Sequence, residues 1–255
     1  MPRLTDLTDI RARLERDRPW AAFSLADLDP PDAEHAQWFG PPLGSAVVLV
    51  YDAYDPPILV CHGDVDDCAT TLTEPHVQTL TTTAYVNMTP AQSDLLARQF
   101  RHFDRRPMVR MLLEAHARAR EPASTPKVER LGPSDLDALR ALYAEEPPAF
   151  FRPAQLRDGV YCGVRDGHDL IAVAGTHVVS TSTHVAALGN VHTRHDRRGL
   201  GLATAVTLAV CTELAGQGIT TCVLNIVASN HAARRVYERV GFREYCRYDE
   251  GIAER

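Results

Sequence analysis

Residues 197–203 combine arginines and glycines in a pattern that suits phosphate chemistry. The segment reads Arg-Arg-Gly-Leu-Gly-Leu-Ala and lies between a strand-like run and a helix-like run. A helix N-terminus presents unpaired N–H groups and a partial positive charge, so it can hold a phosphate. Gly199 and Gly201 let the main chain turn and approach a ligand with no Cβ in the way. Arg197 and Arg198 add fixed positive charge, so the segment predicts a phosphate or diphosphate site.

Three phosphate-binding patterns compete for this segment. A Walker loop needs a lysine after its second glycine, and the segment has none. A dinucleotide fingerprint that begins at Gly199 needs a third glycine where Thr204 stands and an acidic residue ~20 positions later, and it lacks both. The pattern Arg-Gly-x-Gly-x-Gly/Ala fits residues 198–203 completely. The remaining alternative is a glycine-containing turn that only starts a buried helix.

A second motif follows one strand later. It reads Asn230-x-x-Ala233-x-x-x-Tyr237 and is followed by Gly-Phe at 241–242. Together with residues 198–203, this spacing resembles the GCN5-related N-acetyltransferase (GNAT) superfamily, whose order of elements residues 131–249 follow. The nearer resemblance is to tandem members, in which a degenerate half precedes an active half that carries Gly-Asn-Val-x-Thr, here residues 189–193. The first half of the chain has no Arg-Gly-x-Gly, so we do not expect it to bind the cofactor in this way.

The resemblance implies acetyl-CoA or another acyl-CoA as co-substrate, and no metal. It would lie where the strand ending at Thr193 diverges from the strand starting at Thr220. Main-chain groups of Val191 and Thr193 would pair with the pantetheine, and Asn230 would hold it from the other side. The pyrophosphate would be supported by Arg198 and cradled by the main-chain amides of Gly199, Leu200, Gly201, Leu202 and Ala203.

Two helix arginines, Arg234 and Arg235, are candidates for the nucleotide phosphate, although exposed helix arginines are commonly only solvated. The expected chemistry is direct attack of an amine on the thioester in a ternary complex. Such a step needs a neutral amine, a held oxyanion and a protonated leaving thiolate. A main-chain N–H near Val191 or Thr193 would hold the oxyanion. Tyr237 would be the proton donor, because a phenol with a pKa of ~10 stays protonated at neutral pH; its alternative role is packing its helix onto the sheet.

The general base is where this sequence departs from many relatives. They often place Glu or His on the strand before the arginine motif, where this chain has Ala187 and Gly189. A water relay or an amine that arrives neutral is an equal alternative. The other candidates for the base or the acceptor site are Glu145, Glu146, Phe150, Phe151, His177 and His192, and each of them also fits a structural or solvated role.

Two prolines and small residues at 121–127 predict a linker. We therefore expect two GNAT-like α/β domains, each a mixed, mostly antiparallel sheet flanked by helices. Residues 1–122 would form a degenerate N-terminal domain, 123–129 the linker, and 130–255 the acyl-CoA-binding catalytic domain.

In the first half, Leu4, Leu7, Ile10 and Leu14 have helical spacing. Strands are expected at 45–51, 57–61 and 109–113, and in the threonine-rich stretch 77–86. Pro90 would open a helix through Phe100. In the second half, Ser134 is a plausible N-cap for a helix that carries Leu136, Leu139 and Leu142. Strands at 160–165, 170–179 and 184–193 have short connections typical of antiparallel hairpins, and a helix at 201–215, a strand at 220–227, a helix at 230–240 and a strand at 243–247 follow.

Composition narrows the functional class. Thirty-three acids against twenty-seven Lys and Arg give a net charge of −6, which argues against a nucleic-acid partner. The apolar run 200–211 is shorter than the ~20 residues of a membrane span, and six scattered cysteines without a Cys-x-x-Cys pair predict a reduced, cytoplasmic protein. We expect an acyl-CoA:amine N-acyltransferase whose acceptor is a small-molecule or protein amine, with no membrane partner and an open oligomeric state. The alternatives are a non-catalytic acyl-CoA-binding or scaffold protein and, least favoured, an NAD-dependent enzyme.

Overall fold

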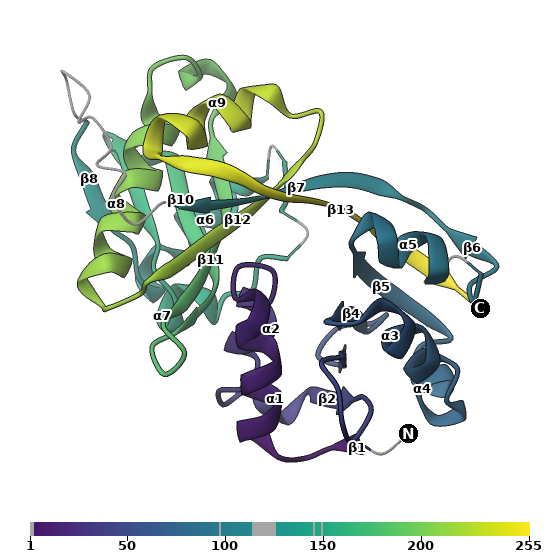
Figure 1. The fold of residues 1–255 in the computed structure, drawn as a ribbon. Coiled ribbons are helices and arrows are strands. Elements are labelled where there is room, and N and C mark those ends of the chain that lie inside the picture. Colours follow the sequence, from purple (N-terminus) through teal and green to yellow (C-terminus); the bar gives the residue numbers. More distant parts are fainter. Residues whose placement is uncertain (1–2, 97, 114–125, 145, 149) are drawn as a thin grey trace. The chain divides into compact units, whose positions relative to one another are not determined.

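The structure is a computed structural model that describes residues 3–96, 98–113, 126–144, 146–148 and 150–255. The chain divides into two compact units. Unit 1 comprises Met1–Arg110, Val227–Ser229 and Tyr245–Arg255, and unit 2 comprises Met111–Ile226 and Asn230–Glu244. The expected boundary at residue 122 and residues 123–125 of the expected linker lie within 114–125, outside the described residues, while the last two residues of the expected linker belong to a strand at Val128–Arg130. Each unit is a sheet with helices packed on it (Figure 1).

Unit 1 is built on a sheet in which β4 and β5 pair in parallel and the other strand pairs are antiparallel. The C-terminal part of β13 completes this sheet by pairing with β5, from Asp249↔Met88 to Glu254↔Thr83. The strands expected at 45–51 and 57–61 are confirmed. The strands of this part of the chain are β1 (Arg3–Leu4), β2 (Ala36–Phe39), β3 (Val47–Tyr51), β4 (Ile58–His62), β5 (Thr83–Met88), β6 (His102–Phe103), β7 (Arg106–Leu113) and β13 (Phe242–Glu254).

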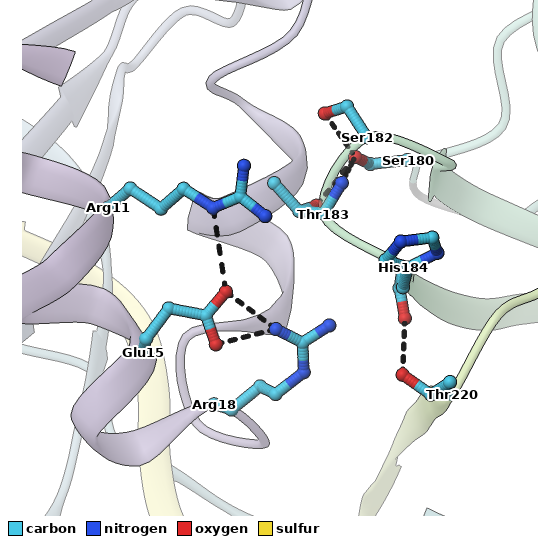
Figure 2. Close-up of polar contacts among 8 residues, drawn as sticks. All are labelled: Arg11, Glu15, Arg18, Ser180, Ser182, Thr183, His184 and Thr220. Atoms are coloured by element: carbon cyan, nitrogen blue, oxygen red, sulfur yellow. Dashed lines mark hydrogen bonds and ion pairs between the residues drawn. The ribbon is translucent and has the colours of Figure 1, made fainter. Parts of the chain in front are cut away.

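The helices of unit 1 are α1 (Leu7–Leu14), α2 (Ala22–Ala26), α3 (Val65–Leu72), α4 (Pro75–Leu80) and α5 (Pro90–Leu96), with 3-10 turns at Glu15–Asp17 and Asp32–Glu34. α1 is capped by Asp6, whose side chain accepts from the N–H of Thr8 (2.9 Å). Beyond its end, Glu15 pairs with Arg18 at 2.5 Å and with Arg11 at 3.7 Å (Figure 2). The core is apolar, with Val48, Leu59, Leu72 and Val86 among its fully buried side chains.

Three local expectations for unit 1 are wrong. The stretch 77–86 is not one strand, because α4 occupies its first part and β5 begins only at Thr83. Threonine does not prevent this helix, since the hydroxyls of Thr79 and Thr81 donate to the carbonyls of Pro75 (2.9 Å) and Val77 (2.8 Å) four residues earlier. Leu4 lies in β1 rather than on the first helix, and Phe100 lies outside α5.

Unit 2 contains the predicted elements in the predicted order, together with a short strand at Val128–Arg130 and a short helix at Gln155–Asp158 that the sequence did not predict. Its strands run antiparallel in the order β8-β9-β10-β11, and β12 pairs with β11 in parallel. They are β8 (Val128–Arg130), β9 (Cys162–Asp166), β10 (Asp169–Ser180), β11 (Val185–Thr193) and β12 (Thr221–Val227). The helices are α6 (Leu136–Tyr143), α7 (Gln155–Asp158), α8 (Leu202–Gly216) and α9 (His231–Val240), with 3-10 turns at Pro133–Asp135 and His195–Arg197. In the described parts of the chain, no helix is both long and apolar enough to cross a membrane.

The cap expected at Ser134 is replaced by another interaction. Ser134 lies inside the 3-10 turn before α6, and the carboxylate of Asp135 accepts from the N–H of Gly132 (2.8 Å). This bond ties the 3-10 turn to the residue before it, and α6 itself begins after Asp135 with no side-chain cap among the described residues, so the expected cap is wrong.

Hydroxyl groups close the turn between β10 and β11, and main-chain hydrogen bonds hold the start of β12. The Ser180 and Thr183 hydroxyls lie 2.5 Å apart, and the N–H of Thr183 donates to Ser180 Oγ (3.0 Å; Figure 2). The carbonyl of His184 accepts from the N–H groups of Thr220 and Thr221, both at 3.1 Å. β11 and β12 are therefore held side by side where they begin.

Candidate functional site

The start of α8 is an uncapped helix N-terminus. Gly201 is the N-cap residue, no side chain in the described part of the chain caps the helix, and its first turn carries no acidic residue. Gly199 (φ +81°) and Gly201 (φ +77°) both have a left-handed backbone, which favours glycine. Crowding is not the reason for glycine here, because a Cβ at either position would meet nothing within 4 Å. Leu200 is 64% exposed, Leu202 is buried and Ala203 is half-buried. The turn therefore offers main-chain N–H groups and open space to an anion.

The two arginines before this turn have different surroundings. Arg198 donates from Nε to the carbonyl of Thr193 (3.2 Å), and its Nη2 lies 3.4 Å from the exposed Glu146 carboxylate. Arg197 pairs with Asp166 at 2.5 Å. The fixed positive charge expected from Arg197 is therefore balanced by a carboxylate, while Arg198 stays at the turn.

β11 leaves β12 before either strand ends. Their parallel register runs from Val185↔Thr221 to Leu188↔Leu224 and stops there, although β11 continues to Thr193. On its other edge, β11 stays paired with β10 as far as Thr193↔Ala172. The edge of residues 189–193 that faces away from β10 therefore has no strand partner in the described ladder, and a ligand can pair with it as an added strand. Val191 and Thr193, the residues expected to bind the pantetheine, lie on this segment.

β11 also carries a β-bulge where the two strands diverge. Val173 pairs with His192 and Gly175 with Gly189, so β11 has one residue more than β10 between these pairs. Asn190 lies in the bulge and has a left-handed backbone, with φ +54°. A bulge re-aims the strand, and here it changes the direction of the main chain immediately before Val191.

Sequence reasoning missed the side chains that hold this bulge. The Tyr143 hydroxyl donates to the Asn190 carbonyl (2.6 Å), and Asn190 Nδ2 donates to the Tyr161 hydroxyl (2.7 Å) and to Gln155 Oε1 (3.2 Å). Burial raises the pKa of both tyrosines, so both hydroxyls keep their protons. The available signal was an asparagine after a glycine inside an apolar strand, because Asn adopts the left-handed conformation more readily than most residues.

Tyr237 lies on α9, which packs against α8. The residue is 8% exposed, and its ring meets Phe242 edge-on with centroids 6.1 Å apart. Burial, and then the neighbouring Cys211, raise the pKa of the Tyr237 phenol. Among the described residues, its hydroxyl forms no hydrogen bond. It is therefore a protonated group whose proton is not already shared.

Asn230 and the α9 arginines are partly committed to the helix itself. Asn230 Oδ1 accepts from the N–H of Ala233 (3.0 Å), so this oxygen serves as the N-cap. Arg234 pairs with Glu238 (3.0 Å) and Glu244 (2.6 Å). Arg235 is exposed and forms no ion pair in the described part of the chain, which leaves it as the available cation of the two.

The candidates for the acceptor site lie in different surroundings. Glu145 lies outside the described residues. Phe151 packs edge-on against Tyr143 (5.3 Å) and Tyr161 (6.2 Å), and the buried His192 lies edge-on to Tyr143 at 6.1 Å. Phe151 and His192 therefore join an aromatic cluster on the same tyrosines that hold the bulge.

His177 fills the space that a strand carboxylate would occupy. A Cβ on Gly189 would lie 1.8 Å from His177 Nε2, so the imidazole lies directly against this glycine. Ala187 is fully buried and cannot titrate. Burial, and then the charge of Arg152, lower the pKa of His177 to about 4, so the imidazole is neutral near pH 7.

Unit 1 contains a similar strand and helix arrangement with a different helix start. β4 and β5 pair in parallel, and α3 follows β4 as α8 follows β11. The α3 N-cap is Asp64, whose carboxylate accepts from the N–H of Asp67 (3.0 Å), and Asp66 and Asp67 place two further acids in the first turn. This helix start is capped and negatively charged, so it repels an anion.

The end of β4 is also covered by side chains of unit 1. The Cys61 carbonyl accepts from Trp20 Nε1 (3.0 Å) and from Gln92 Nε2 (3.1 Å), and Ser24 Oγ lies 2.9 Å from His62 Nε2. All five residues are buried. The position that corresponds to the open edge of β11 is therefore occupied by the protein itself.

Known proteins resemble the chain in both sequence and structure. Residues 161–250 match the family described as FR47-like protein. A mycothiol acetyltransferase of Streptomyces coelicolor is 37% identical over 123 residues, which are 47% of this chain and about a third (35%) of that protein.

Two solved structures have the same fold over nearly the whole chain. A putative GNAT-family acetyltransferase from Novosphingobium aromaticivorans has a TM-score of 0.62 at 22% identity and covers 94% of this chain and 99% of its own. A GCN5-related N-acetyltransferase from Kribbella flavida has a TM-score of 0.67 at 16% identity, over 93% and 94%. The expected mixed α/β fold is confirmed, and it is the fold of these solved GCN5-related N-acetyltransferases.

Proposed function

We propose that this chain is an N-acyltransferase that moves an acetyl or other short acyl group from acyl-CoA to an amine. The observation that carries the proposal is the uncapped start of α8, with its two left-handed glycines and open space. A diphosphate suits this turn because it would accept hydrogen bonds from the main chain and lie at the positive end of a helix dipole. All six cysteines are free, in keeping with a reducing, cytoplasmic location.

The residues of unit 2 fit the rest of an acyl-CoA molecule. The unpaired edge at Val191 and Thr193 would bind the pantetheine, with Asn230 nearby on the helix that follows β12. Arg198 would support the diphosphate, and Arg235 is the better placed of the two α9 arginines for the nucleotide phosphate, because Arg234 is already paired. The amides that would cradle the diphosphate are those of Gly199, Leu200, Gly201, Leu202 and Ala203.

Acyl-CoA, when bound, supplies an activated acyl thioester. The N–H of Val191 would donate to the acyl carbonyl oxygen, where negative charge develops during attack. Tyr237 would give its phenolic proton to the departing sulfur. Positions 187 and 189 carry no titratable side chain, so the amine would attack in its neutral form and release its extra proton to solvent, from which Tyr237 regains one.

We also propose that the chain is a tandem GNAT protein whose first half has lost its cofactor site. The support is the capped, acidic start of α3 and the side chains of Trp20 and Gln92 over the end of β4. The division into residues 1–122 and 130–255 accounts for the parallel strand pair in each half. The C-terminal residues Tyr245–Arg255 nevertheless group with unit 1.

The first test is binding of acetyl-CoA by thermal shift. Ligand at 100 times its dissociation constant stabilises the folded state by ~2.7 kcal/mol, so Tm should rise clearly. A panel of amines is then screened for release of free thiol, and it includes amines of the mycothiol type because one relative carries that name. No rise in Tm at millimolar acetyl-CoA would contradict the proposal.

The missing strand carboxylate favours a second candidate, a non-catalytic acyl-CoA-binding protein. The variant Tyr237→Phe separates the two. An enzyme should lose roughly 10²-fold in kcat, the usual contribution of a positioned general acid, while the Kd for acetyl-CoA stays unchanged. The matched control is Tyr51→Phe, which removes a hydroxyl that donates to Asp32 in unit 1. A wild-type protein that binds acetyl-CoA but acylates no amine would establish the binding role.

A further inference from the structure

Asn190 is held at its main-chain carbonyl and at its side-chain amide by buried side chains from other elements. Tyr143 is the last residue of α6, Gln155 the first of α7, and Tyr161 directly precedes β9. Tyr143 holds the Asn190 carbonyl, while Tyr161 and Gln155 hold its side-chain amide. All four residues are at most 8% exposed. The side-chain nitrogen and the main-chain carbonyl of this left-handed Asn thus both form hydrogen bonds with buried side chains.

The same glutamine holds the segment that precedes α7. Gln155 Oε1 also accepts from the N–H of Arg152 (3.0 Å), and its Nε2 donates to the carbonyls of Phe150 (3.3 Å) and His177 (3.2 Å). The Tyr161 hydroxyl closes the group by donating to Gln155 Oε1 (3.1 Å). The bulge of β11 and the segment at residues 150–152 therefore share one amide as their anchor.

The sheet makes room for this group. A Cβ on Gly175 would lie 2.2 Å from the Tyr161 ring, so glycine is needed there for the ring to lie against β10. Gly175 pairs with Gly189, against which His177 lies. Two glycines opposite each other in the ladder thus accept two rings next to the bulge.

We propose that Tyr143, Gln155, Tyr161 and Asn190 are positioning residues that fix the direction of the Val191 N–H toward the reacting carbonyl and tie it to the segment at 150–152. This inference rests on the proposed function and adds residues that do not touch the acyl donor. Val191 directly follows Asn190, so rotation about the Asn190 backbone swings its N–H. A misplacement of ~1 Å at a reacting centre costs on the order of 10²-fold in rate.

The test uses the full-length chain and the variant Asn190→Gly. Glycine adopts φ +54° without strain, so the variant can keep the bulge while it loses the amide anchor. We expect kcat for thiol release to fall by roughly 10- to 100-fold, with the Kd for acetyl-CoA unchanged. Hydrogen exchange of residues 186–194 should become faster. Tyr161→Phe, which removes one acceptor of the Asn190 amide, should also lower kcat and speed exchange while the Kd stays unchanged. Tyr51→Phe in unit 1 should change none of the three readouts.

Two results would overturn the inference. The first is wild-type kcat together with wild-type exchange at 186–194 in Asn190→Gly. The second is an equal fall in kcat and in acetyl-CoA affinity, which would indicate general loss of structure rather than misdirection of one N–H group. If the wild-type chain acylates no amine, the proposed function fails, and unchanged exchange in Asn190→Gly would separately overturn the inference.

Discussion

The substitution Gly201→Asp would place a carboxylate at the start of α8, where we expect the diphosphate to bind. The fold should tolerate it, since a Cβ at this position meets no atom within 4 Å. The left-handed backbone (φ +77°) costs an L-residue roughly 1–2 kcal/mol, less for Asp and Asn. A capping side chain returns about 1 kcal/mol. We therefore expect the free energy of unfolding to change by no more than about 1 kcal/mol.

The effect on binding should be larger and electrostatic. One carboxylate about 4 Å from a unit of phosphate charge is repelled by about 1 to 4 kcal/mol in surroundings between water and a protein surface. This corresponds to a roughly 5- to 1,000-fold weaker Kd for acetyl-CoA. The control is Gly201→Asn, which has the same shape, the same backbone strain and the same capping capacity without the charge. The difference between the two variants isolates the charge term.

Isothermal titration calorimetry of both variants at about 0.05 M and 1 M salt measures this term. The Debye length falls from about 10 Å at 0.1 M to about 3 Å at 1 M, so the gap between Asp and Asn should narrow as salt rises. Equal Kd values for the Asp variant and the wild type would refute the assignment of the turn. An Asn variant as weak as the Asp variant would show that backbone geometry, and not charge, controls the site.

Three further outcomes follow from contacts in the two units. Gly189→Ala should lower the free energy of unfolding by roughly 1–3 kcal/mol, because its Cβ would lie 1.8 Å from His177 Nε2. In a His177→Ala background this cost should shrink. Strictly additive costs in the double-mutant cycle would contradict the contact. Burial, and then the charge of Arg110, lower the pKa of His62 to about 3, so below about pH 6.5 the unfolded chain binds a proton that the folded chain does not. The free energy of unfolding, measured with urea, should therefore fall from about pH 6.5 toward 3, and it should fall more in the wild type than in His62→Gln. Parallel pH curves for the two proteins would exclude this cause. Asp64→Ala removes the α3 cap and should lower the free energy of unfolding by about 1 kcal/mol. Calorimetry should still find one acetyl-CoA bound per chain. A second bound molecule would contradict the closed site in unit 1.

The local pattern was enough to predict the glycine turn before α8 and most of the elements of unit 2. Gly199 and Gly201 are informative because few other residues adopt the left-handed backbone that both have. The strands and helices of unit 2 follow apolar runs interrupted by glycine, and the αL C-cap of α9 falls on Gly241 as such patterns predict.

The rest depends on contacts that local patterns do not contain. Tyr143 is 47 residues from Asn190 in sequence, and Tyr161 is 29 residues away, so no periodicity links them. β13 pairs with β5, whose residues lie in the other half of the chain. In and at the end of α4, threonine hydroxyls donate to helix carbonyls. Tertiary context thus outweighs the preference of threonine for strands, on which the predicted strand rested.

The most direct test of the account is a titration of the 15N-labelled chain with acetyl-CoA, followed by amide resonances. Binding should shift the N–H signals of Leu202 and Ala203 in a saturable way, together with that of Val191, because these groups would donate to the diphosphate and the acyl carbonyl. The N–H signals at the start of α3, including Asp66, should not move. Saturable shifts at α3 with an unchanged α8 turn, or no shifts at millimolar acetyl-CoA, would contradict the account.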